Sequence, residues 1–149
     1  MTNTSIPLAR HATALLLSAC LVGGAATSVL TTPATGAEQS ARTLEARLRP
    51  SGDPNGSGEA HFRFRQAAGK VCATVEWSNI EQPDSAHIHR RSTSAVVIDL
   101  GGSVTGGAHC VSGVRPRLIG KILAHPHRFY FNVHNPTYPA GAIQGVLHR

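Results

Sequence analysis

The stretch EAHFRFRQAAGKVCATVEW, residues 59–77, decides the fold class of this 149-residue chain. In its first part Ala60, Phe62 and Phe64 alternate with polar residues, which is the two-residue period of a strand with one buried face. The run from Val71 to Trp77 alternates in the same way, and AAGK between the two runs supplies a tight turn. The stretch therefore predicts an antiparallel β-hairpin with one apolar face.

Short strand-like segments continue on both sides of this hairpin. They occupy residues 43–48, 85–90, 95–100, 110–114, 128–134 and 142–148, and loops rich in Gly and Pro separate them. Only PRLIGKILA, residues 116–124, has apolar residues four apart, and it predicts one short helix. We expect an all-β Greek-key β-sandwich of about seven short strands, either immunoglobulin-like or superoxide-dismutase-like.

The first 37 residues have the layout of a secretory signal peptide. Arg10 is followed by an apolar run to Leu30 and then by small residues, with a cleavage site after Ala37. Glycines and hydroxyl residues interrupt this run, so we do not expect a transmembrane anchor. LSAC, ending at Cys20, also matches a bacterial lipobox, which leaves a lipid anchor on the outer face of a membrane as the alternative to secretion. Residues 38–42 are a predicted linker, and 43–147 the domain.

Removal of the signal peptide leaves two cysteines, Cys72 and Cys110. An even number in an exported chain predicts one disulfide, worth roughly 4 kcal/mol in the chain-entropy model. No C-x-x-C spacing supports a thiolate site instead.

The charge distribution argues against nucleic acid as a partner. Of the 14 basic residues only Arg10 precedes residue 38, so the exported chain has 13 basic and 8 acidic residues, and 13 − 8 is +5. The basic residues are scattered and aromatic residues are few, whereas nucleic-acid binding favours a dense basic stripe with interleaved aromatics. A weak affinity for anionic cell-surface polymers is the milder implication.

Three stretches together resemble the CHRD domain family, named after its repeats in chordin. They are CATVEWSNIEQPDSAHIHR, HCVSG and ILAHPHRFYFNVHNPTYPAGAIQGVL, and the resemblance spans residues 43–147. Family members often have HIHRG where this chain has Arg91, and GAIRGQL where it has Gln144 and Val146. The resemblance implies a β-sandwich, export and a binding role, by family analogy.

His87 and His89 are two apart on a predicted strand, so their side chains lie on the same face. The resemblance adds His134, which faces away from Phe131 and Val133. If the two strands pair, the three imidazoles can converge on one copper or zinc ion. The alternative is a polar face on which the rings hydrogen-bond to the backbone and, through water, to one another.

HIH is also similar to the copper-binding histidine pair of copper–zinc superoxide dismutases, but the 101–109 loop offers only His109 as a further histidine, so we do not expect dismutase activity. No G-x-S-x-G elbow or phosphate loop is present, and we do not expect an enzyme.

The sequence predicts an exported binding or interaction module that requires no cofactor. Its partner would be an extracellular protein or a cell-surface polymer, and its binding surface would combine Arg90 and Arg91 with Asn135 and Tyr138. A copper- or zinc-binding protein using the three histidines is the second interpretation.

Overall fold

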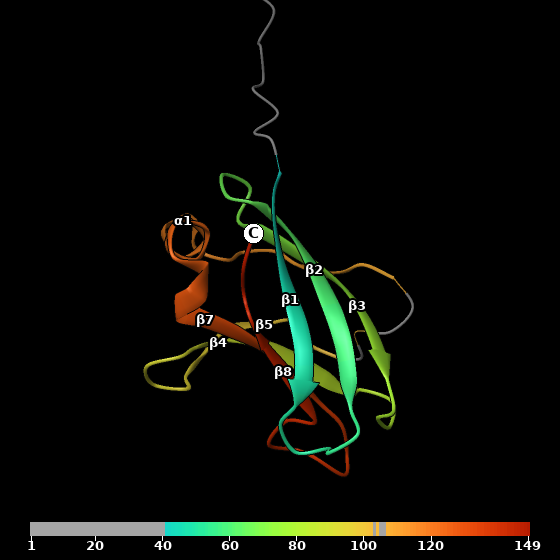
Figure 1. Ribbon diagram of the computed structural model, residues 1–149. Helices are drawn as coiled ribbons and strands as arrows, with labels where there is room; N and C mark the ends of the chain where they lie inside the picture. Colours follow the sequence, from blue (N-terminus) through green and yellow to red (C-terminus); the bar gives the residue numbers. More distant parts are fainter. Residues whose placement is uncertain (1–40, 103, 105–106) are drawn as a thin grey trace, which may run out of the picture. The chain divides into compact units, whose positions relative to one another are not determined.

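The computed structural model describes residues 41–102, 104 and 107–149 (Figure 1). The predicted signal peptide, its cleavage site after Ala37 and the lipobox cysteine Cys20 lie outside these residues. Within the described ranges, no helix has both the length and the apolar character that crossing a membrane requires.

The described residues form eight strands and one α-helix, so the all-β prediction is confirmed, and each of the eight strands overlaps one of the predicted segments. The strands are β1 (Arg42–Pro50), β2 (Ser57–Arg65), β3 (Lys70–Ser78), β4 (Ser85–Arg90), β5 (Val96–Asp99), β6 (His109–Val111), β7 (Phe129–His134) and β8 (Ile143–Val146). The helix, α1 (Pro116–Ala124), has the predicted bounds, and a single 3-10 turn, η1 (Pro126–Arg128), follows it. β1 begins inside the predicted 38–42 linker.

All strand pairs are antiparallel, in the order β5-β4-β7-β8-β1-β2-β3-β6. The pairs β4–β7, β8–β1 and β3–β6 join strands that are distant in the sequence, as the crossovers of the expected Greek-key connectivity require. β1, β2 and β3 are successive hairpin partners, and the turn between β2 and β3 contains Gly69 at φ +58. At this position a Cβ would also meet the Val114 carbonyl oxygen, so a glycine is favoured for two reasons.

The sheet is nearly closed, and its two halves enclose one core. β1 and β8 share only two residue pairs, Arg49 with Gln144 and Pro50 with Ile143. In Figure 1 the β1–β3 group crosses over β4, β7 and β8, and the Phe62 ring of β2 meets the Phe131 ring of β7 edge-on at 5.0 Å between centroids. Three side chains of α1 are also buried: Ile119, Ile122 and Leu123. The apolar faces of both halves thus meet, as in a sandwich.

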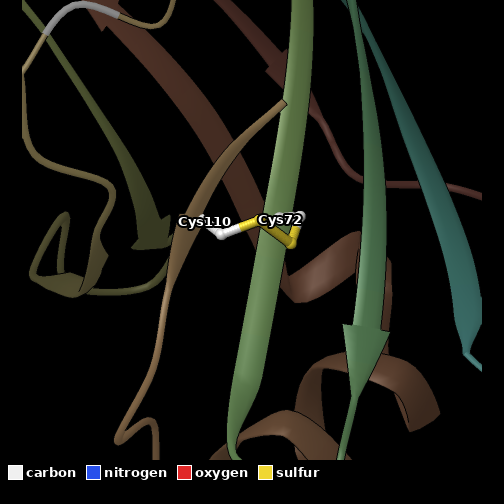
Figure 2. Close-up of a disulfide and its surroundings, with 2 residues drawn as sticks. All are labelled: Cys72 and Cys110. Atoms are coloured by element: carbon white, nitrogen blue, oxygen red, sulfur yellow. A yellow bond between two sulfur atoms is a disulfide. The ribbon is translucent and has the colours of Figure 1, made fainter. Parts of the chain in front are cut away.

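The predicted disulfide is present in the structure. Cys72 of β3 and Cys110 of β6 are directly opposite each other in the strand pairing, with a sulfur–sulfur distance of 2.06 Å (Figure 2). It therefore attaches β6, a three-residue strand at the edge of the sheet, to a nine-residue strand.

Candidate metal centre

β4 and β7 bring the three histidines together on the outer face of the sheet. Their register places Ser85 opposite His134 and His87 opposite Asn132, so His134 is the diagonal neighbour of His87. The apolar residues of both strands, such as Ile88 and Phe131, face the core instead. One potential ligand atom from each of His87, His89 and His134 lies within 4.8 Å of the other two. Whether these residues meet was open from the sequence, and the pairing of β4 with β7 brings them together.

Two backbone carbonyls orient two of the three rings. His89 Nδ1 lies 2.9 Å from the Ser94 carbonyl oxygen, and His134 Nδ1 lies 3.0 Å from that of Pro139. A carbonyl oxygen can only accept, so each Nδ1 carries the proton and donates. The lone pair is therefore on Nε2 in both rings. Metal-binding histidines are commonly held by such a bond from the second ring nitrogen.

The third ring bonds to one of the other two. His87 Nδ1 lies 3.0 Å from His134 Nε2. Because His134 Nε2 carries a lone pair, His87 Nδ1 must be the donor of this hydrogen bond. His87 Nε2 lies 3.5 Å from an oxygen of Asp99, a largely exposed carboxylate of β5. A single proton thus occupies the position between two ring nitrogens of the cluster.

Burial favours the uncharged form of two of the three rings, His87 and His134. His89 and His134 are 7% and 8% exposed, and His87 is partly buried. Desolvation is the main cause that lowers the pKa of His87, the neighbouring His134 lowers it further, and Asp99 partly opposes both. Desolvation also lowers the pKa of His134, against the hydrogen bond to the Pro139 carbonyl. Neutral imidazole is the form that binds a metal ion.

Among the described residues, two buried side-chain atoms have no hydrogen-bond partner, and both lie on this face. They are His89 Nε2 and Asn132 Oδ1. An unpaired buried acceptor costs about 1–3 kcal/mol. A cation beside His89 Nε2 would remove that cost.

Neighbouring side chains that the sequence analysis did not single out support the cluster. The Tyr130 ring stacks on His89 at 4.8 Å between centroids and 14° between planes. Asn132 donates to the Ala140 carbonyl, and a Cβ at Gly141, where φ is +127, would collide with the Asn132 amide. The loop 135–142 therefore packs closely against β7. Alternation along RFYFNVH places Tyr130, Asn132 and His134 on one face, but it does not reveal these contacts.

The structure does not bring together the four residues of the predicted binding surface, Arg90, Arg91, Asn135 and Tyr138. Arg90 pairs with Phe129, at the opposite end of β4 from the Ser85–His134 pair, so Arg90 lies about 20 Å along the strands from Asn135, and Arg91 lies farther. Antiparallel pairing is the physical reason for this separation.

The same four residues also differ in exposure. Asn135 is fully buried: its Oδ1 accepts from the Tyr138 amide and its Nδ2 donates to the Glu81 carbonyl. Tyr138 packs against the core. Arg90 lies over the Phe129 ring, and only Arg91 is well exposed.

A second cluster, Glu45, Glu59 and His61, lies on β1 and β2. His61 and Glu59 are exposed, and His61 Nδ1 is 3.5 Å from Glu45. Nothing buries or orients these groups as the carbonyls orient His89 and His134, so we assign no site to them.

Comparison with known proteins supports the family resemblance. The CHRD domain model matches residues 25–147, which begins inside the predicted signal peptide and ends where the predicted domain ends. No curated protein and no solved structure matches the chain. The family match covers most of the sequence, including all eight strands and the histidine cluster, and the chain therefore belongs to the CHRD domain family.

Proposed function

We propose that this CHRD domain protein is an extracytoplasmic binding module whose ligand is a copper or zinc ion held by His87, His89 and His134. One observation carries the proposal: three imidazoles converge within 4.8 Å, and in two of them a backbone carbonyl holds the proton on Nδ1, which leaves the lone pair on Nε2. Imidazole nitrogen suits both metals.

The spacing within the cluster fits metal ligands. Zinc–nitrogen bonds of 2.0–2.1 Å, at angles between square and tetrahedral, separate two ligand nitrogens by about 2.9–3.4 Å. The His87 and His134 nitrogens are 3.0 Å apart. An ion bound to both nitrogens would replace the proton between them, and both rings would turn so that their lone pairs point at the ion. Divalent copper should bind more tightly than zinc, because nitrogen sites follow the Irving–Williams order.

The extracytoplasmic location rests on two features that support export independently. One is the signal-peptide pattern of residues 1–37, and the other is the Cys72–Cys110 disulfide, a bond that persists mainly in oxidising compartments. The proposed role is binding, with no catalytic step.

Metal titration of single-site variants tests this function. The full-length protein, produced without a histidine tag under oxidising conditions, would be titrated with Cu²⁺ and Zn²⁺ at pH 7.5 and pH 5. We expect near-stoichiometric binding at pH 7.5 that weakens at pH 5, because protonated imidazoles cannot bind the ion. His89→Ala should lower the affinity by on the order of a hundredfold, since it removes a ligand and not an outer contact.

The matched control is His125→Ala, which removes an exposed imidazole outside the cluster. It should bind as the unaltered protein does. Absence of binding at both pH values, or equal loss in the two variants, would contradict the metal proposal and leave the three rings as a hydrogen-bonded polar face.

A further inference from the structure

A basic hollow of about 710 Å³ lies beside the histidine cluster on the same face of the sheet. Arg47 and Arg49 of β1 line one side and Arg91, directly after β4, lines another. Tyr130 and Val146 form an apolar part of the lining. The strand pairing explains why the hollow lies beside the histidines. Directly paired residues share one face of the sheet, and four such residues form a row across β1, β8, β7 and β4: Arg49, Gln144, Asn132 and His87.

A second hollow, of about 500 Å³, shares the lining residue Arg91 with the first. It adds Arg90, Arg128 and His127. No acidic side chain lines either hollow. Among the described residues, no carboxylate lies within ion-pair distance of these arginines, although Glu59 is opposite Arg47 in the strand pairing.

We propose that these two hollows, joined at Arg91, form a groove that binds an acidic polysaccharide. Arginine suits carboxylate and sulfate groups because its planar fork donates two hydrogen bonds to one anion. The two adjoining hollows fit an extended chain better than a compact ligand. Between the arginines, Tyr130 and Val146 offer apolar contact for sugar rings, and Ser94 and Gln144 offer neutral hydrogen bonds.

Other polyanions fit the groove less well. A membrane surface would favour a convex patch with exposed apolar side chains, but Val96 and Val146 are the exposed large hydrophobic residues of the described chain, and Val146 lines a hollow. Single-stranded nucleic acid would require several aromatic stacking platforms. The lining of the two hollows has one tyrosine, Tyr130, and no phenylalanine or tryptophan.

The groove uses different side chains from the metal centre, so this inference stands apart from the proposed metal binding. Its test measures the affinity of the full-length, metal-free protein for fluorescent polygalacturonate, dextran sulfate and uncharged dextran. We expect binding to one or both acidic polymers, weakened by salt, and none to dextran. Preference between the two identifies the carboxylate or the sulfate as the group recognised.

Charge-matched variants locate the site. Arg47→Glu with Arg49→Glu should lower the affinity by on the order of tenfold or more. Arg115→Glu with Arg117→Glu changes the net charge equally at exposed positions outside both hollows and should bind normally. Arg91→Gln, a milder change at the junction, should cost about threefold.

Three results would overturn the proposal. They are equal losses in the two double variants, no detectable binding to either acidic polymer, and tighter binding to phosphatidylglycerol vesicles or to a single-stranded oligonucleotide than to both polymers. Circular dichroism of each variant shows whether a loss of polymer affinity comes from the groove or from unfolding. If a double variant unfolds, the polymer affinity of Arg91→Gln is the test.

Discussion

At the scale of single residues, the three histidines differ in how their protons are held. His89 and His134 donate to carbonyls, whereas His87 donates to His134. Protonation of the acceptor, His134 Nε2, would therefore break the bond between two rings and place positive charge in a partly desolvated cluster. Burial is the main cause that lowers the pKa of both His87 and His134, and a neighbouring ring lowers each further: His134 acts on His87, and His89 acts on His134.

These lowered pKa values predict that the metal-free protein loses stability in mild acid. The unfolded chain binds protons at these histidines near pH 6.5, whereas the folded protein binds them only at lower pH. The unfolded state therefore holds more protons in this window, and the free energy of unfolding should fall as the pH drops below about 6.5. Urea unfolding at pH 7.5, 6.5 and 5.5 measures the change.

The same series with His87→Asn and His134→Asn combined provides the control. Without the two titrating rings, the free energy of unfolding should depend less on pH across this window. An equally steep dependence in the variant would assign the acid sensitivity to other groups.

At the scale of elements, β6 depends on the disulfide more than on its own pairing. It has three residues, lies at the edge of the sheet, and is held by Cys72–Cys110 in the middle of its register with β3. A strand this short forms few hydrogen bonds, so the covalent bond holds it in place.

Replacing both cysteines, Cys72→Ser with Cys110→Ser, should lower the free energy of unfolding by about 4 kcal/mol, because the unfolded chain regains the entropy of an open loop. Urea unfolding of the oxidised protein and the variant tests this. Metal affinity serves as the internal control: the histidines lie on β4 and β7, in the other half of the sheet, so the folded variant should retain it. A loss below about 1 kcal/mol would show that β6 is held mainly by its packing.

At the scale of the whole domain, packing between the two halves of the sheet matters more than their shared hydrogen bonds. β1 and β8 are joined through two residue pairs, while Phe131 of β7 is fully buried and meets Phe62 across the core. Burial of such rings supplies the larger share of the free energy that holds the halves together.

Phe131→Ala should therefore lower the free energy of unfolding by about 3–5 kcal/mol, as for other buried phenylalanines. Val146→Ala, at a side chain that is 39% exposed, should change it by less than about 0.5 kcal/mol. Chemical denaturation of both variants makes the comparison. Similar values for the two would mean that the halves are not coupled through this contact.

How much could be predicted from the sequence depended on the range of the interaction. The β2–β3 hairpin, α1 and the shared face of His87 and His89 follow from periods of a few residues and were predicted correctly. The position of Asn135 was misjudged because polar turn residues are commonly exposed, whereas here its side-chain amide accepts from the Tyr138 backbone in its own loop and donates to the Glu81 carbonyl before β4.

The sequence by itself determined the all-β class and the cysteine pair, because strand periodicity is local and the two cysteines after the predicted cleavage site allow one intramolecular bridge. Only the tertiary structure decided that β4 pairs with β7, which brings His134 to His87, and that β1 meets β8, which brings Arg49 toward Arg91. Strand pairing joins residues far apart in the chain, and its register is set by the packing of the complete core. The local sequence pattern of one strand therefore does not reveal which strand it pairs with.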